Sequence, residues 1–202
     1  MTTRLWTRIE QARERWNVLR HPFYRRWSAG ELNPGELARY SGQYRRAVEA
    51  IATLSQTVAQ AAPERPALRR HADEERDHVA LWDGFVAAAG GSHDDEPTPE
   101  TTGCVRAWLR GGDLPTGLMT LYAIESGQPE VSRTKRHGLV DRYGFAEGPA
   151  TAYFRVHEAR DTEHAAEARA LLEELAPRCD ADGLAATAER AFRANWRLLD
   201  GV

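Results

Sequence analysis

The segment HEARDTEH carries two histidines and an aspartate at a spacing that fits one face of a helix. His157, Asp161 and His164 occupy positions i, i+4 and i+7, which at about 100° per residue fall within about 60° of one another along roughly 10 Å of helix. Imidazole nitrogen combined with carboxylate oxygen suits iron, manganese or zinc. The alternative is a solvated polar face with scattered histidines, and this segment alone does not separate the two interpretations.

A second segment, HADEERDHVALW, repeats this mixture of acids and histidines. Its candidate ligands, at offsets 0, 3, 4 and 7 on one helical face, are His71, Glu74, Glu75 and His78. Glu-x-x-His or Glu-x-x-x-His is the spacing by which one helix gives a carboxylate and an imidazole to one metal, as di-iron bundles do. Charged helices also contain such strings by chance, so a plain charged helix is the alternative here.

The segment LMTLYAIESGQP holds a lone acid, Glu125, in the most apolar helical stretch of the chain. A buried carboxylate without a partner would shift its pKa and cost several kcal/mol, so a metal ion would be a favourable partner. Glu49, in the apolar segment AVEAIATL, is a weaker case of the same kind. The three helices that carry the histidines and Glu125 offer enough donors for two metal ions about 3.5–4 Å apart.

These donors must be positioned by helices, because helical periodicity runs through almost the whole chain without a strand pattern or an internal repeat. Asn33 predicts an N-cap with Pro34 in the first turn, and Gly90 followed by Gly91 predicts a C-terminus. We predict an all-α, single-domain bundle of seven or eight helices over residues 1–202. The expected helices span about 4–19, 35–61, 65–89, 103–110, 114–127, 131–142, 148–176 and 183–199, with an extended loop over 91–103 and a break or kink at Pro129.

The composition excludes several classes of protein. The 202 residues suit one domain. They include 27 basic and 30 acidic side chains, a formal charge of -3 and 42% hydrophobic residues. That balance argues against a long disordered chain and against a polycationic arm for nucleic acid. Of the 27 basic residues, only Lys135 is a lysine.

The expected location is the cytoplasm, without membrane attachment. No apolar run approaches the length of a membrane span, and the first residues, MTTRLWTRIEQARERW, are charged and amphipathic rather than typical of a signal peptide. Cys104 and Cys179 stand alone and far apart, which indicates a reducing compartment and neither a disulfide framework nor a zinc ribbon.

Five segments together resemble the heme-oxygenase-like diiron oxidases, and within them the chlamydial protein associating with death domains and its bacterial relatives that make p-aminobenzoate. The segments are HPFYRRWSAGEL, DEERDHVALWDGF, LYAIESGQPEVSRTKRHGL, DRYGF and AYFRVHEARDTEHA. The resemblance covers about residues 15–176 and implies a heme-oxygenase-like bundle. PQQ synthase C and the thiaminase-like TenA proteins share that fold, but the thiaminase-like proteins lack this ligand set.

The resemblance implies a set of ligands for two metal ions. Carried over position by position, they are Glu74 or Glu75, His78, Glu125, His157, Asp161 and His164. One departure concerns the first glutamate, which in the chlamydial pattern lies seven residues before its histidine. Alignment of the acidic pair favours Glu74, whereas the Glu-x-x-His spacing of other members of the superfamily favours Glu75, so both remain candidates.

The resemblance also implies catalytic roles for Tyr24 and Lys135. In the p-aminobenzoate-forming proteins a tyrosine of the protein supplies the ring and a lysine the amino group, while the dimetal centre activates dioxygen. The tyrosine of the HxFYxxW motif falls on Tyr24, and the lysine falls on Lys135, the one lysine of this chain. Arginine cannot give up its proton to act as an amine donor, whereas a desolvated lysine can. A surface lysine and an amphipathic tyrosine at a helix start are the alternatives.

The functional prediction is a non-heme dimetal oxygenase, Fe/Fe or Mn/Fe, that uses dioxygen and an external electron donor to form p-aminobenzoate. One alternative keeps the metals but acts on an external amine, amino acid or fatty acid. A second is a metal-free protein of the PQQ synthase C or TenA type that binds a cofactor precursor. Bundles of this type often pair, so a homodimer is a further expectation, and no nucleic-acid or membrane partner is expected.

Overall fold

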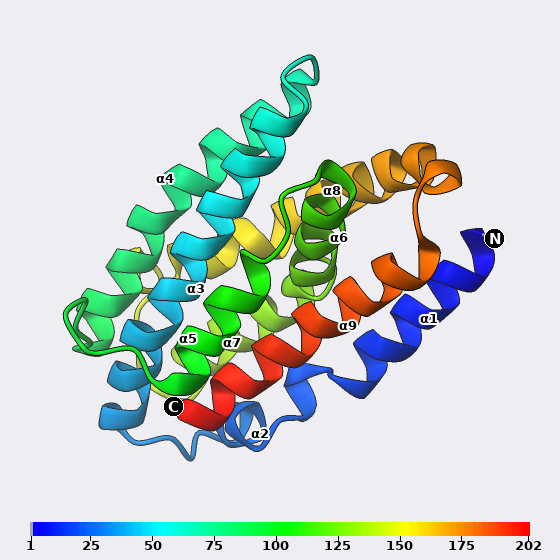
Figure 1. The fold of residues 1–202 in the computed structure, drawn as a ribbon. Helices are drawn as coiled ribbons and strands as arrows, with labels where there is room; N and C mark the ends of the chain where they lie inside the picture. Colours follow the sequence, from blue (N-terminus) through cyan, green and yellow to red (C-terminus); the bar gives the residue numbers. More distant parts are fainter. Residues whose placement is uncertain (1) are drawn as a thin grey trace.

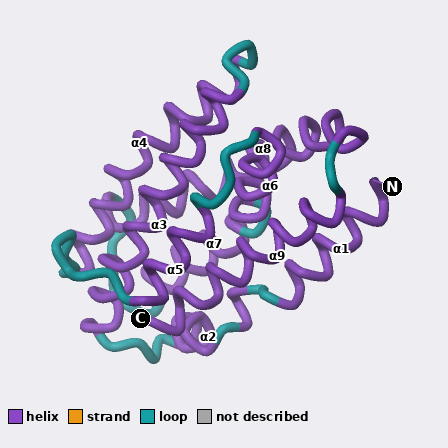
Figure 2. The backbone as a smooth tube through the Cα atoms, viewed as in Figure 1, coloured by secondary structure: helices purple, strands orange, loops and turns teal. Residues whose placement is uncertain are grey.

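The computed structural model describes residues 2–202, so Met1 of the domain predicted over 1–202 lies outside the described residues. The described part of the chain forms helices and loops and contains no strand (Figures 1 and 2). The all-α prediction is therefore confirmed. The α-helices are α1 (Thr2–Arg15), α2 (Pro22–Ala29), α3 (Pro34–Ala61), α4 (Pro66–Ala89), α5 (Pro99–Trp108), α6 (Leu114–Glu125), α7 (Gln128–Asp141), α8 (Pro149–Leu175) and α9 (Ala181–Leu198). Short 3₁₀ turns cover Val18–Arg20, Ala176–Arg178 and Leu199–Gly201.

Each of the eight helices expected from the sequence corresponds to a helix of the structure, and the short α2 is additional. The first helix ends at Arg15 instead of about residue 19. Two other boundaries differ because proline lies in the first turn of a helix in both places. The loop predicted to end at residue 103 ends at Thr98, whose hydroxyl accepts a hydrogen bond from the backbone N–H of Thr101 and caps α5 ahead of Pro99. Pro129 likewise lies in the first turn of α7 instead of breaking the chain.

The ends of the longest helices follow the predicted signals. Asn33 caps α3 by accepting from the backbone N–H of Glu36, while the Glu36 side chain accepts from the backbone N–H of Asn33. Gly90 ends α4 with a φ of 71°, a left-handed conformation that glycine adopts without strain. These caps determine where α3 and α4 begin and end, and hence which residues reach the interior.

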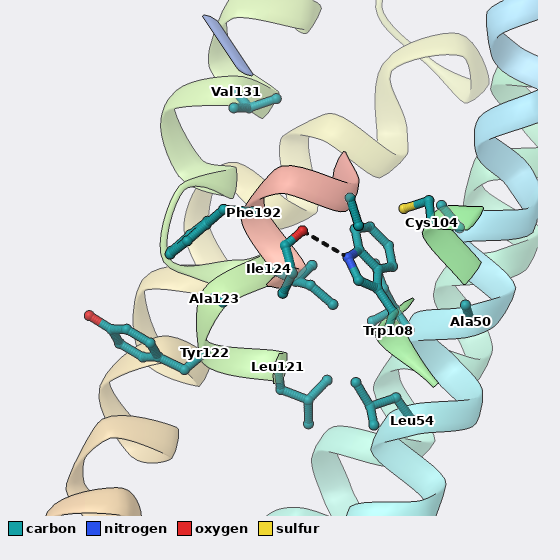
Figure 3. Close-up of a cluster of buried hydrophobic side chains, with 14 of the residues drawn as sticks. Ala50, Leu54, Cys104, Trp108, Leu121, Tyr122, Ala123, Ile124, Val131 and Phe192 are labelled. Atoms are coloured by element: carbon teal, nitrogen blue, oxygen red, sulfur yellow. Dashed lines mark hydrogen bonds between the residues drawn. The ribbon is translucent and has the colours of Figure 1, made fainter. Parts of the chain in front are cut away.

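The helices pack into one bundle around a continuous apolar core. In Figure 1, α3 and α4 form a long antiparallel pair, and α9 lies beside both α1 and α5, as the helix contacts also show. Figure 3 shows part of the core, where the Trp108 indole N–H of α5 donates to the carbonyl oxygen of Ala191 in α9 at 3.2 Å. The helices α4 and α6 both pack on α8, so these three can bring their polar residues together.

None of the helices in residues 2–202 combines the length and the apolar character that crossing a membrane requires. Cys104 is buried and Cys179 half-buried, and both are free thiols, as the sequence predicts.

Candidate metal centre

Three packed helices bring seven buried acid and imidazole side chains together in the interior. They are His71, Glu75 and His78 of α4, Glu125 of α6, and His157, Asp161 and His164 of α8. The spacing i, i+4, i+7 occurs on both α4 and α8, and the two helices pack on each other. Each helix therefore turns a stripe of donor atoms toward the other.

Glu75 lies at the centre of this cluster. Its Oε1 is 3.0 Å from His78 Nδ1, and its Oε2 is 3.8 Å from His157 Nε2. The same Oε1 also lies 3.9 Å from His71 Nε2 and 4.0 Å from His164 Nδ1. Glu75 thus belongs to two groups of three donors that could each hold a metal ion, one with His78 and His157 and one with His71 and His164.

Glu125 and Asp161 add carboxylate oxygens to the group that contains His71 and His164. His71 Nε2 lies 2.9 Å from Glu125 Oε1, yet the pair lacks the alignment of a hydrogen bond. Asp161 Oδ1 lies 3.7 Å from His164 Nδ1. The imidazole rings of His71 and His164 are close, with 4.0 Å between their centroids. These donor atoms lie close together without forming hydrogen bonds. Such an arrangement is expected where several ligands point toward one metal position.

Many inward-facing atoms of the cluster have no hydrogen-bond partner within residues 2–202. They are His71 Nε2, His157 Nε2, His164 Nδ1 and both carboxylate oxygens of Glu125 and of Asp161. Buried polar groups are almost always paired, because leaving them unpaired is costly. The donor set of imidazoles and carboxylates is one that iron, manganese and zinc accept. The residues present therefore fit a dimetal centre.

The protonation of the cluster reflects its burial and its crowded charges. Burial alone would raise the pKa of Glu75, but His157 and His78 outweigh it and hold that pKa well below its usual range. Burial lowers the pKa of His157, whereas Asp161 and Glu75 raise it to about 9. His71 follows the same pattern, since Glu125 overcomes burial and raises its pKa to about 9. A bound metal ion would replace the positive charge of the protonated histidines. It would therefore compete with protons for the same nitrogen atoms.

Groups outside the cluster orient two of the histidines. His157 Nδ1 lies 2.8 Å from the carbonyl oxygen of Tyr153, which directs Nε2 inward. His164 Nε2 lies 3.1 Å from Glu74 Oε2, which directs Nδ1 inward. Glu74 is held in turn by Arg160, whose Nη2 donates to both carboxylate oxygens at 2.7 and 2.8 Å. Such outer contacts fix the tautomer and the orientation of metal-binding imidazoles.

The structure separates the two glutamates that the sequence left as alternatives. Glu75 is buried between the histidines, whereas the Glu74 side chain is 33% exposed and bound to Arg160. His71, a candidate from its helical spacing that the ligand set implied by the resemblance omits, belongs to one of the donor groups. Its position four residues before Glu75 on the same helical face was the available signal. Glu49 lies outside the cluster, 45% exposed and paired with Arg45 at 2.5 Å.

Lys135 of α7 is fully buried in a pocket of aromatic rings. Its Nζ has no hydrogen-bond partner in the described part of the chain. The ring centroids around it, at 4.6 to 5.6 Å, belong to Tyr24, Tyr40, Tyr44, Trp82 and Phe154. Burial lowers the pKa of Lys135 to about 7, against a smaller opposing effect of Asp161. A large fraction of this amine is therefore neutral at neutral pH, the form that can act as a nucleophile.

Tyr24 of α2 is brought beside Lys135 by two contacts. The hydroxyl groups of Tyr24 and Tyr40 lie 2.8 Å apart, and burial raises the pKa of Tyr24 well above its usual value, so the phenol stays protonated. The indole N–H of Trp27 donates to the carbonyl oxygen of Lys135 at 3.2 Å. Gly138 permits this approach, because a Cβ there would lie 2.4 Å from Trp27 Nε1. The predicted pair, Tyr24 and Lys135, thus shares one pocket.

Aromatic rings connect the histidine cluster with the Lys135 pocket. Tyr153 stacks on His157 with 3.8 Å between the ring centroids. Trp82 lies 4.8 Å from Tyr153 and 5.1 Å from Tyr44, also between ring centroids. The two regions are therefore parts of one continuous buried site.

Comparison with known proteins agrees with this arrangement. The family described as iron-containing redox enzymes matches residues 71–196. The 4-aminobenzoate synthase of Chlamydia muridarum is 31% identical over 198 residues, which cover 91% of this chain and 84% of that protein. The 4-aminobenzoate synthase of Nitrosomonas europaea is 31% identical over 211 residues, covering 92% of this chain and 85% of that protein.

Solved structures confirm the heme-oxygenase-like fold. A TenA homologue from Pseudomonas syringae aligns with a TM-score of 0.85 at 19% identity, over 98% of this chain and 90% of that one. A protein from Shewanella denitrificans, described as having a heme oxygenase-like fold, aligns with a TM-score of 0.78 at 18% identity, over 99% of this chain and 90% of that one. At such identities the likeness concerns the fold alone.

Proposed function

The chain belongs to the family of iron-containing redox enzymes, and we propose that it forms 4-aminobenzoate from its own Tyr24 and Lys135 with two metal ions and dioxygen. Relatives named 4-aminobenzoate synthase, similar over 91% of this chain, support the product. The observation that carries the proposal is the cluster of seven buried acid and imidazole side chains, whose inward atoms lack partners in the described residues.

The residues of the cluster would divide between two metal ions. Glu75, which belongs to both donor groups, would help to hold both ions, and His78 and His157 would complete one group. The second ion would be held by His71 and His164, close to the carboxylates of Glu125 and Asp161. Bound iron, or iron with manganese, would supply the redox chemistry that dioxygen activation requires. An external electron donor is part of the proposal.

Lys135 would supply the amino nitrogen. Its amine is buried, has no acceptor among the described residues and is partly neutral at pH 7, because burial lowers its pKa to about 7. Arginine occupies the other basic positions of the chain, and a guanidinium does not lose its proton at neutral pH. A lysine at this one position supports a chemical role.

Tyr24 would supply the aromatic ring. Its ring centroid lies 5.6 Å from Lys135 Nζ, so the amine and the ring share one water-poor pocket. The hydroxyl of Tyr40 holds the Tyr24 phenol in place. The packing of Trp27 on the Lys135 backbone keeps α2 and α7 at this separation. The proposal also includes a single domain over residues 1–202, a location in the cytoplasm and assembly as a homodimer.

The test uses the chain alone. The protein is purified without oxygen and loaded with iron, or with iron and manganese, before reductant and dioxygen are added. Mass spectrometry then measures 4-aminobenzoate. We expect less than one equivalent per chain from the wild type, no product from Tyr24→Phe or Lys135→Arg, and wild-type yield from the control Tyr122→Phe, whose ring packs on Trp6 away from the pocket.

The single lysine permits a direct tracer experiment. Growth on lysine with a heavy ε-nitrogen labels one side-chain amine in this chain, that of Lys135. The product should then be one mass unit heavier. Product without the label would refute the use of Lys135. So would the formation of many equivalents of product per chain only when an amine is added, and either result would favour an external substrate. Failure to bind metal after loading would refute both forms of the dimetal function.

A further inference from the structure

A cleft of about 490 Å³ lies between α5 and α9, and arginines dominate its lining. The arginines are Arg106, Arg110, Arg190, Arg193 and Arg197. We refer to it as the arginine cleft. It shares no lining residue with the metal cluster or the Lys135 pocket. On α9, Arg190, Arg193 and Arg197 stand at i, i+3 and i+7, so they project from one helical face.

The charges of the arginine cleft are not balanced by the protein. Glu100 is the one acid among its lining residues. Within residues 2–202 none of the five guanidinium groups forms an ion pair, whereas Arg26, Arg45 and Arg160 elsewhere do. Partial burial, together with Arg110 and Arg193, lowers the pKa of Arg190. Like charges at helical spacings repel each other, so an anion bound among these arginines would relieve their repulsion.

The floor of the arginine cleft is small and largely apolar. Gly103 and Ala107 of α5 and Ala194 of α9 are the small residues of its lining, and they leave room between the long arginine side chains. The hydrogen bond from Trp108 to Ala191 joins the same two helices (Figure 3). The cleft is therefore in the size range of sites for small organic ligands.

We propose that the arginine cleft binds a phosphate ester the size of a nucleoside diphosphate. A guanidinium group can donate two parallel hydrogen bonds to the oxygens of a phosphate. The five arginines together offer more donors than a single carboxylate could accept. The apolar floor accepts the organic part of the ligand. A concave site of this volume suits a small molecule better than the flat surface of a protein partner. The proposal does not depend on the function of the metal cluster.

The test measures binding of adenosine diphosphate to the full chain by calorimetry, with adenosine and pyrophosphate as matched probes. We expect one site per chain for adenosine diphosphate, no binding of adenosine, and weaker binding of pyrophosphate because it lacks the organic group. Affinity should fall as salt rises. Arg193→Gln with Arg197→Gln, both at exposed positions, should weaken binding roughly tenfold or more.

The control is Arg178→Gln, which removes the same charge from an exposed position outside the cleft and should leave the affinity unchanged. A second readout concerns the ligand-free protein. The double variant removes two of the five positive charges and so reduces their mutual repulsion. Its melting temperature should therefore equal or exceed that of the wild type. Absence of binding, equal binding by the double variant, or equal affinity for pyrophosphate and adenosine diphosphate would each overturn the proposal.

Discussion

Replacement of Lys135 by methionine should stabilise the fold at acidic and neutral pH. The side chain is fully buried, and burial lowers its pKa from the ordinary value of 10.5 to about 7. At about 1.4 kcal/mol for each unit by which a pKa falls, the buried ammonium disfavours the folded state by roughly 5 kcal/mol below pH 7. Methionine has a similar length and no charge, so Lys135→Met should recover most of that free energy.

The sign of the pH dependence follows from the proton balance. Below about pH 7 the lysine is protonated in both states, and the difference in stability between the two proteins is constant. Between about pH 7 and 10.5 the unfolded chain binds one proton more, so the wild type gains stability as pH rises. The advantage of Lys135→Met should therefore shrink to roughly 2 kcal/mol at pH 9.

The assay is urea denaturation of both metal-free proteins at several pH values from 6 to 9. Their difference in unfolding free energy isolates Lys135, because the other titrating groups are common to both proteins. The charged or titratable groups that face it, Tyr24, Tyr40, Tyr44 and Asp161, are unchanged. A difference that stays constant across this range would show that Lys135 titrates as an ordinary exposed lysine, and one that grows with pH would show that folding raises its pKa. Either result would refute the reasoning.

Three further predictions follow from the site. Glu75→Gln should lose most of the bound metal in elemental analysis, because it removes a carboxylate from both donor groups, whereas the control Glu49→Gln, at an exposed position outside the cluster, should keep its metal; equal loss in both variants would contradict a central role for Glu75. Metal loading should raise the melting temperature of the wild type and do so less in Glu75→Gln, since a ligand that binds only the folded state stabilises it; an unchanged melting temperature would argue against binding at the buried cluster. Gly138→Ala should destabilise the fold by about 1–3 kcal/mol in denaturant titrations, because its Cβ would lie 2.4 Å from Trp27 Nε1. Gly103 has open space around it, so the control Gly103→Ala should not lose stability. Equal effects at the two glycines would refute this account.

Local sequence signals determined most of the helical architecture. Proline, asparagine and glycine mark where α3 and α4 begin or end, and the same caps are present in the structure. Periodicity also placed three of the buried cluster residues, His157, Asp161 and His164, on one face of α8. Helical geometry is a property of neighbouring residues in the chain, so the sequence alone suffices for such features.

Tertiary packing decided which donor atoms point inward. Glu74 and Glu75 are adjacent and differ by about 100° around α4, too little for spacing alone to choose between them. The choice depends on how α4 is rotated against α8, where Arg160 binds Glu74 and the histidines surround Glu75. His71 enters the cluster for the same reason.

The pockets formed by distant segments were also beyond the reach of the sequence. The aromatic rings around Lys135 come from α2, α3, α4 and α8, and their combined burial lowers the pKa of its amine. The arginine cleft exists because α5 packs on α9, although its arginines lie far apart in the sequence. Residue types and helical faces follow from local chemistry, whereas burial and the convergence of charges arise only when helices distant in sequence pack together.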